Sequence, residues 1–228
     1  MDTITRADTL QGLTLDAGTA LDLLTGAAIA AHSKADLPAL NCVNVSASDG
    51  TLTAVATDRF RLIYGEIALE REGAGDDVET VAWSSSNPTG EREGVSLDQI
   101  SIPLADIKRI TAAIKALPKA ALSRATVSLN RAGDILTVTI NAGEGGTNLV
   151  VNLYTGQQFP PYKQLFNGEP VPVSELQLNA DYLAAFAKVP TSGGGQTFTF
   201  TGDRKPIRVK INHDVITWHG LLMPMRTN

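Results

Sequence analysis

The sequence of 228 residues contains a single cysteine, Cys42, and only three histidines, His32, His213 and His219. One cysteine excludes an internal disulfide, and so few histidines beside it do not supply a structural zinc site of ordinary ligand spacing. Apolar runs stop well short of the roughly 18 residues of a transmembrane helix, and residues 1–10 carry acids where a signal peptide has a basic start. We therefore expect a cytoplasmic protein with no membrane segment and no metal.

The common catalytic and phosphate-binding motifs are also missing. The sequence has no Gly-x-Gly-x-x-Gly after a predicted strand, no phosphate loop ending in Gly-Lys-Ser/Thr, no Gly-x-Ser-x-Gly and no His-Glu-x-x-His. The glycine run at 193–195 lacks a following lysine and precedes a predicted strand, which favours a flexible loop. His213 and His219 flank a predicted strand without a nucleophile nearby. We expect a protein that is not an enzyme and uses no cofactor.

Composition favours a folded chain with a weakly acidic surface. Hydrophobic residues make up 43% of the sequence and charged residues 19%, which suits one large or two small globular domains. The formal charge of -5 argues against capture of nucleic acid by the whole surface, but it leaves room for a local basic face.

One pattern occurs three times along the chain, at 13–24, 100–111 and 176–187. In each stretch apolar residues alternate as in a strand and then recur with helical spacing, which predicts a strand that leads directly into a helix. Asp16 and Asn179 are predicted N-caps, and Pro103 suits the first turn of its helix.

Three predicted strands follow each helix. They cover 40–46, 52–57 and 62–67 in the first unit, 125–129, 135–140 and 149–154 in the second, and 197–201, 207–211 and 215–222 in the third. The alternation within these strands gives each sheet one buried and one solvated face. The predicted fold class is therefore α+β, with repeated strand-helix-three-strand half-domains and helices on one face of antiparallel sheets.

Two segments lie outside the repeated units. Residues 71–98 are rich in acids and turn-forming residues, with 81–83 as a plausible extra strand, and predict an acidic surface excursion. Residues 159–173 contain four prolines and predict an extended connector instead of a helix. This connector divides the chain into a domain of two half-units at 1–168 and a single half-unit at 169–228.

The second predicted helix, at 102–124, is strongly basic. Its charged residues are one acid, Asp106, and five bases, namely Lys108, Arg109, Lys115, Lys119 and Arg124. Spacings of seven and four place Lys108, Lys115 and Lys119 on one stripe, unless Pro118 ends the helix before the last of them. Two interpretations stay open for this stripe: a solvated helix face, or sequence-independent contact with DNA phosphates.

Three short motifs together resemble one protein family. They are Ala-Thr-Asp-Arg-Phe-Arg-Leu at 56–62, Phe-Pro-Pro-Tyr at 159–162 and Leu-Met-Pro-Met-Arg at 222–226. In order and spacing they resemble the bacterial DNA polymerase III beta subunit, the DNA sliding clamp. The resemblance implies a non-enzymatic ring around duplex DNA, with the helices lining the hole, the sheets forming the rim, and each domain built from two strand-helix-three-strand halves.

The resemblance also implies a pocket in which polymerases and other replication proteins insert a short peptide motif. The residues at matching places are Thr57, Arg61, Leu62, Pro160, Leu165, Pro206, Leu221, Met223, Pro224, Met225 and Arg226. Two departures concern this pocket: Arg59 and Phe60 replace Gly-His, and Gln164 stands where a basic residue is common. We include Arg59 and Phe60 among the predicted pocket residues.

The resemblance covers only part of a full clamp. Residues 1–168 resemble the middle domain and 174–228 resemble the second half of the last domain, so we expect a shortened clamp of the kind that a phage encodes. The implied partners are double-stranded DNA, a DNA polymerase and other clamp-motif proteins, with a clamp loader as a further candidate. We expect a homo-oligomer. A ring of twelve halves at three per chain would contain four chains, whereas the alternative form of ring has three chains of four halves, and the sequence leaves the number open. The alternative function is a clamp-derived interaction module that binds clamp motifs without encircling DNA.

Overall fold

The computed structural model describes residues 9–48, 50–69, 97–143, 145–193 and 195–225. The first unit comprises β1 (Thr9–Asp16), α1 (Ala17–Ala28), β2 (Cys42–Ser48), β3 (Thr51–Thr57) and β4 (Arg61–Ala68). The second comprises β5 (Leu97–Pro103), α2 (Leu104–Lys115), α3 (Lys119–Leu122), β6 (Thr126–Ala132), β7 (Ile135–Asn141) and β8 (Gly146–Asn152). The third has η1 (Lys163–Phe166) before it and comprises α4 (Ala180–Phe186), β9 (Gln196–Thr199), β10 (Ile207–Asn212) and β11 (Thr217–Leu222).

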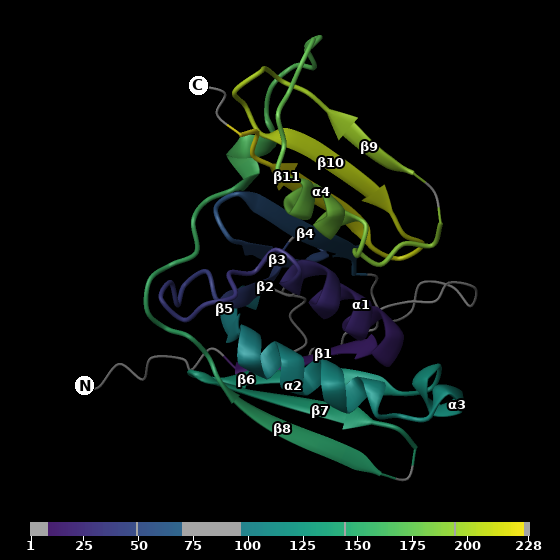
Figure 1. Ribbon diagram of the computed structural model, residues 1–228. Helices are drawn as coiled ribbons and strands as arrows, with labels where there is room; N and C mark the ends of the chain where they lie inside the picture. The colour runs from purple at the N-terminus through teal and green to yellow at the C-terminus, as the bar shows by residue number, and fades with distance from the viewer. Residues whose placement is uncertain (1–8, 49, 70–96, 144, 194, 226–228) are drawn as a thin grey trace.

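The strands form two antiparallel sheets in which the three units are interleaved (Figure 1). The first two units exchange their opening strands, because β1 pairs with β6 and β5 pairs with β2. The four-stranded sheet has the order β1-β6-β7-β8, and the seven-stranded sheet has the order β5-β2-β3-β4-β11-β10-β9. The antiparallel α+β fold class predicted from the sequence is confirmed.

Two of the three predicted helix starts are confirmed. The Asp16 carboxylate accepts a hydrogen bond from the Thr19 amide at 2.8 Å, and Asn179 caps α4 in the same way. Pro103 is different: its ψ of 140° is extended, so it is the last residue of β5 and precedes the first helical turn. The prediction that Pro103 lies in that first turn is wrong, because the strand continues up to it.

The basic helix is shorter than predicted. α2 ends at Lys115, and Pro118, with a ψ of 141°, precedes the separate one-turn helix α3. A proline has no amide hydrogen and its ring clashes with the preceding turn, which accounts for the break. Lys119 therefore does not continue the α2 stripe of Lys108 and Lys115. Of the two outcomes that the sequence left open, the helix ends before Pro118.

The third unit lacks the opening strand that the sequence predicted at 176–178. In the first two units this strand pairs with the other unit of the same domain, and no such partner half is found among the described residues. The unit instead extends the first unit's sheet, because β11 pairs with β4 over six residues. The prolines at 159–173 flank the single 3-10 turn of η1, so this connector is not extended throughout. The division at 168/169 stays a prediction.

The acidic excursion predicted at 71–98 lies almost wholly outside the described residues. The plausible strand at 81–83 also lies there, and residues 97 and 98 belong to β5.

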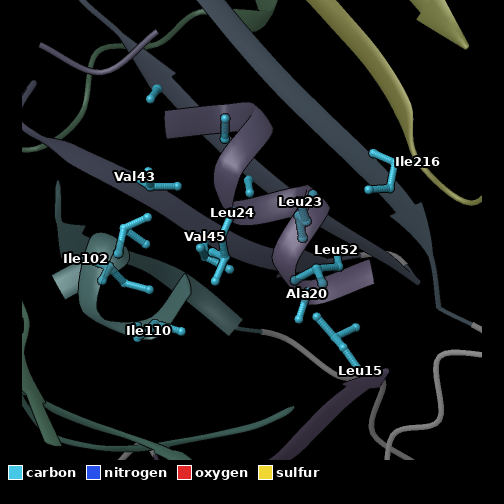
Figure 2. Close-up of a cluster of buried hydrophobic side chains, with 14 of the residues drawn as sticks. Leu15, Ala20, Leu23, Leu24, Val43, Val45, Leu52, Ile102, Ile110 and Ile216 are labelled. Atoms are coloured by element: carbon cyan, nitrogen blue, oxygen red, sulfur yellow. The ribbon is translucent and has the colours of Figure 1, made fainter. Parts of the chain in front are cut away.

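The main core lies between the helices and the inner faces of both sheets. Figure 2 shows Leu23 and Leu24 of α1 among side chains from the first two units, with Ile216 of the third unit beyond them. Every residue of α1 is buried or half-buried. Burial of a leucine side chain contributes about 1.5 to 3 kcal/mol to the free energy of unfolding. Because Leu23 and Leu24 lie in one core with residues of all three units, α1 stabilises the packing of the units against one another.

Candidate functional site

A pocket of about 440 Å³ opens on the outer face of the seven-stranded sheet. Side chains along β4 point alternately to the two faces of this sheet. Ile63 and Ile67 pack in the main core on the inner face, whereas Leu62 and Tyr64 point to the outer face, where the pocket lies. Three segments line the pocket: the loop after α1, the turn between β3 and β4, and the connector after β8. Their lining residues are Asp36, Leu37, Pro38, Ala39, Leu40, Thr57, Arg59, Leu62, Tyr154, Gln157, Gln158, Phe159, Pro160, Pro161, Tyr162 and Leu165.

Aromatic side chains hold the connector against the sheet beside this pocket. The Tyr64 ring lies 5.4 Å from that of Tyr162, 5.1 Å from that of Phe166 and 4.7 Å from that of His219. Arg208 Nη1 donates a hydrogen bond to the Phe166 carbonyl oxygen at 2.7 Å. Burial raises the pKa of Tyr162 to about 12 and that of Tyr64 further, so both phenols are neutral near pH 7. These two tyrosines therefore add no charge beside the pocket.

The turn at 57–61 forms one rim of the pocket and has a dense set of local hydrogen bonds. Thr57 Oγ1 donates to the Arg61 carbonyl oxygen at 2.7 Å and accepts from the Arg59 amide at 3.2 Å. Asp58 accepts from the Phe60 amide at 3.0 Å and from Arg61 Nε at 3.0 Å. Arg59 has a φ of 79°, in the left-handed region that favours glycine. The rim thus presents a cation on a strained backbone.

Phe60 and Arg61 point to the third unit. The Phe60 ring stacks on Tyr182 of α4 with centroids 5.7 Å apart, and the Arg61 guanidinium lies 5.1 Å from the centroid of the same ring. The Met223 amide donates to the Phe60 carbonyl oxygen at 2.8 Å, which continues the β4–β11 pairing. These two residues connect the first unit to the third.

The structure brings together part of the predicted pocket set. Thr57, Arg59, Leu62, Pro160 and Leu165 line the pocket. Leu221 is buried with Leu62 and Tyr64 in the second apolar cluster. The remaining described members do not line this pocket; they are Phe60, Arg61, Pro206, Met223, Pro224 and Met225. Arg226 lies outside the described residues.

Sequence reasoning missed two segments of the lining. The loop at 36–40 carries no periodic pattern, so nothing local distinguishes it from other loops. Phe159 and Tyr162 belong to the Phe-Pro-Pro-Tyr motif, and that motif was the signal that could have added them.

The four predicted DNA-contacting residues of the second unit are exposed. Lys108, Arg109 and Lys115 lie on α2 and Lys119 on α3. Arg109 forms an ion pair with Asp106 on its own helix, which reduces its free charge. The neighbouring helix α1 has no lysine or arginine, so it adds no positive charge beside α2.

Within the described ranges, no group of three or more His, Cys, Asp or Glu side chains is placed to hold a metal ion. No helix in the same part of the chain has the length and apolar character needed to cross a membrane.

No family model and no curated protein matches the sequence. Solved structures do match the fold. The DNA polymerase III beta subunit of Thermotoga maritima superposes with a TM-score of 0.66 at 13% identity, over 100% of this chain and 68% of that one. The beta sliding clamp of C. crescentus superposes with a TM-score of 0.69 at 16% identity, over 100% of this chain and 68% of that one. The DNA polymerase beta subunit of Streptococcus pyogenes superposes with a TM-score of 0.70 at 14% identity, over 99% of this chain and 68% of that one.

The chain has the fold of a DNA sliding clamp. Identities of 13 to 16% establish the likeness at the level of the fold. The chain spans about two thirds of the length of each of these clamps.

Proposed function

We propose that the chain is a DNA sliding clamp, a processivity factor that encircles duplex DNA as a homo-oligomer and tethers a DNA polymerase through the pocket described above. The observation that carries the proposal is the apolar pocket on the outer face of a sliding-clamp fold, beside the junction of the first and third units. The pocket has the size and apolar lining that suit an inserted peptide. In this role the protein works in the cytoplasm, is not an enzyme and needs no cofactor.

The tethered peptide enters the pocket with its apolar side chains. Leu62, Pro160 and Leu165 offer apolar contacts, and Thr57 and Arg59 offer polar ones at the rim. The C-terminal segment with Met223 and Met225 is exposed next to Phe60, so it can bind a longer peptide that leaves the pocket on that side. The polymerase and other clamp-motif proteins share this site, and a clamp loader is a further user of it.

DNA contact is assigned to the exposed cations of the second unit. In this proposal the exposed side chains of Lys108, Arg109, Lys115 and Lys119 contact phosphates without reading sequence. The alternative function is an interaction module that binds clamp motifs without encircling DNA. The absence of any basic residue from α1 favours this alternative, because α1 then adds nothing to phosphate binding.

The test is binding of a fluorescent clamp-motif peptide to the pocket. Leu165 is 47% exposed and lines the pocket, so Leu165→Ala removes an apolar contact with little effect on the fold. We expect roughly tenfold weaker binding, equivalent to about 1.4 kcal/mol. The matched control is Val171→Ala, which trims an apolar side chain that is 41% exposed and outside the pocket. Equal affinity in both variants would remove the pocket from the proposal.

A further inference from the structure

The pocket lining contains one acidic and one basic side chain among apolar and uncharged ones. They are Asp36, in the loop between α1 and β2, and Arg59, in the turn between β3 and β4. β2 and β3 are antiparallel neighbours, so the start of β2 and the end of β3 lie at the same end of the sheet. The loop and the turn therefore border the pocket from neighbouring strands and give it one negative and one positive edge.

Asp36 is held at the pocket by the residues of its own loop. His32 Nε2 lies 2.8 Å from Asp36 Oδ1. The backbone of His32 is fixed to the end of the loop, because its amide donates to the Leu40 carbonyl oxygen at 2.9 Å and its carbonyl oxygen accepts from Asn41 Nδ2. The hydrogen bond with His32 lowers the pKa of Asp36, so this carboxylate is ionised near neutral pH. The Asp36 side chain is still 65% exposed and can contact a ligand.

Arg59 is exposed, and its neighbours in the turn leave its charge free. The adjacent carboxylate, Asp58, is buried and accepts hydrogen bonds from the Arg61 side chain and from two backbone amides of the same turn. Within the described ranges no ion pair joins Arg59 with Asp36 or with any other acid. Both edges of the pocket therefore keep a charge that a bound peptide can meet.

The other polar groups near the pocket do not cancel this polarity. Lys34 lies on the same loop as Asp36, but it acts on the pKa of that carboxyl less than His32 does, and it does not line the pocket. The connector contributes the side chains of Gln157 and Gln158, which carry no charge.

We infer that the peptide bound in this pocket carries charges of opposite sign at its two ends, a basic residue at Asp36 and an acidic residue at Arg59. The apolar segment between them contacts Leu62 and Leu165. Exposed ion pairs add little affinity, but each edge repels the wrong charge, so the two residues select between peptides and determine the direction in which a peptide lies. This inference rests on the proposed function and adds to it the chemistry of the partner.

The test compares two fluorescent peptides of identical composition, with blocked ends and the same neutral clamp-motif core. One has lysine before the core and glutamate after it, and the other has the reverse order. Because their net charges are equal, general attraction to the protein does not separate them. We expect the wild-type protein to bind one of them roughly tenfold more tightly at low salt, and the difference to vanish at about 1 M salt, where charges are screened beyond about 3 Å.

Charge substitutions assign this preference to the two residues. Asp36→Asn and Arg59→Gln should each reduce it to about threefold, and Asp36→Arg combined with Arg59→Asp should reverse it. Position 59 keeps a non-glycine residue in every variant, so its left-handed backbone is equally strained in each. A third peptide with glutamine at both ends should bind the variants and the wild-type protein alike, which a disturbed fold would not allow. The matched control is Asp203→Asn, which removes an exposed acid outside the pocket and should leave the preference unchanged.

The outcomes distinguish this inference from the proposed function. Equal affinity for the two charged peptides overturns the inference and leaves the pocket in the proposed function. An unequal affinity that neither Asp36→Asn nor Arg59→Gln changes also overturns it, because the selection then lies elsewhere. Leu165→Ala should weaken both peptides to the same extent and keep their ratio. If neither peptide binds, the proposed function fails together with the inference.

Discussion

Trp218 of β11 is the residue through which we expect the third unit to be most sensitive to change. Its side chain is 0% exposed and packs against two glycines, Gly26 of α1 and Gly65 of β4. A Cβ atom at position 26 would lie 2.3 Å from Trp218 Cη2, and one at position 65 would lie 2.7 Å from Trp218 Cζ3. Both distances are too short unless the indole moves. The Trp218 side chain of the third unit therefore requires glycine at positions 26 and 65.

The magnitude follows from two opposing effects. Replacing a helical glycine by alanine normally stabilises a helix by about 0.5 to 1 kcal/mol. Overpacking a full core costs about 1 to 3 kcal/mol. For Gly26→Ala the second effect exceeds the first, and we expect a net loss of about 1 to 2 kcal/mol in the free energy of unfolding. For Gly65→Ala, the added Cβ would lie within 3 Å of Ile216 Cγ2 as well as of two indole atoms, and we expect a net loss of about 2 to 3 kcal/mol.

Urea unfolding of a double-mutant cycle measures this effect. Trp218→Phe removes the outer ring of the indole, which contains Cη2 and Cζ2, so in that background Gly26→Ala should become neutral or stabilising. Gly18→Ala in the same helix is the control, because its nearest neighbour is a single side-chain oxygen of Asp16 at 3.2 Å. A stabilising Gly26→Ala in the wild-type background would refute the packing of the third unit on α1.

Three further predictions concern the charged and titratable groups. Simultaneous replacement of Lys108, Lys115 and Lys119 by alanine should reduce the slope of the logarithm of the DNA-binding constant against the logarithm of the salt concentration by about 2.7, at roughly 0.9 per phosphate contact. An unchanged slope would show that these lysines face solvent and do not contact DNA. Arg59→Gly removes the strain of a left-handed backbone at a non-glycine residue and should stabilise the fold by about 1 kcal/mol. Arg59→Gly together with Phe60→His should shift the preference among clamp-motif peptides away from those with acidic or aromatic ends. An unchanged ranking of the peptides would contradict a role of Arg59 and Phe60 in specificity. Burial lowers the pKa of His219 although the Glu66 carboxylate lies 3.9 Å away. The contribution of neutral His219 to the free energy of unfolding is therefore fully present above the ordinary pKa of about 6.5, and it is lost as the pH falls below that value. Urea unfolding of His219→Phe should lack this pH dependence.

Local sequence patterns predicted the order of the elements well. Alternation of apolar residues determines which face of a strand is buried, so β3, β7 and β10 were predicted to within one residue. Asp16 and Asn179 were recognised as caps because a short polar side chain before an apolar helix has a specific partner in the first turn.

Pairing between units could not be predicted in the same way. The exchange of β1 and β5 joins residues 50 or more positions apart in sequence, and periodicity holds no information on which strand lies beside which. The loss of the strand at 176–178 has the same origin, since a strand forms only where a neighbour satisfies its backbone. The pocket lining at 36–40 is irregular, and its function depends on the connector that folds over it.

Retention of the protein on DNA circles tests encirclement most directly. The protein is assembled on a nicked circular plasmid, separated from free protein by gel filtration, and the plasmid is then cut once. A sliding clamp should remain with the circle and leave the linear DNA through its ends within the same time. Equal retention on circular and linear DNA, or no retention on either at physiological salt, would contradict encirclement and favour the interaction module.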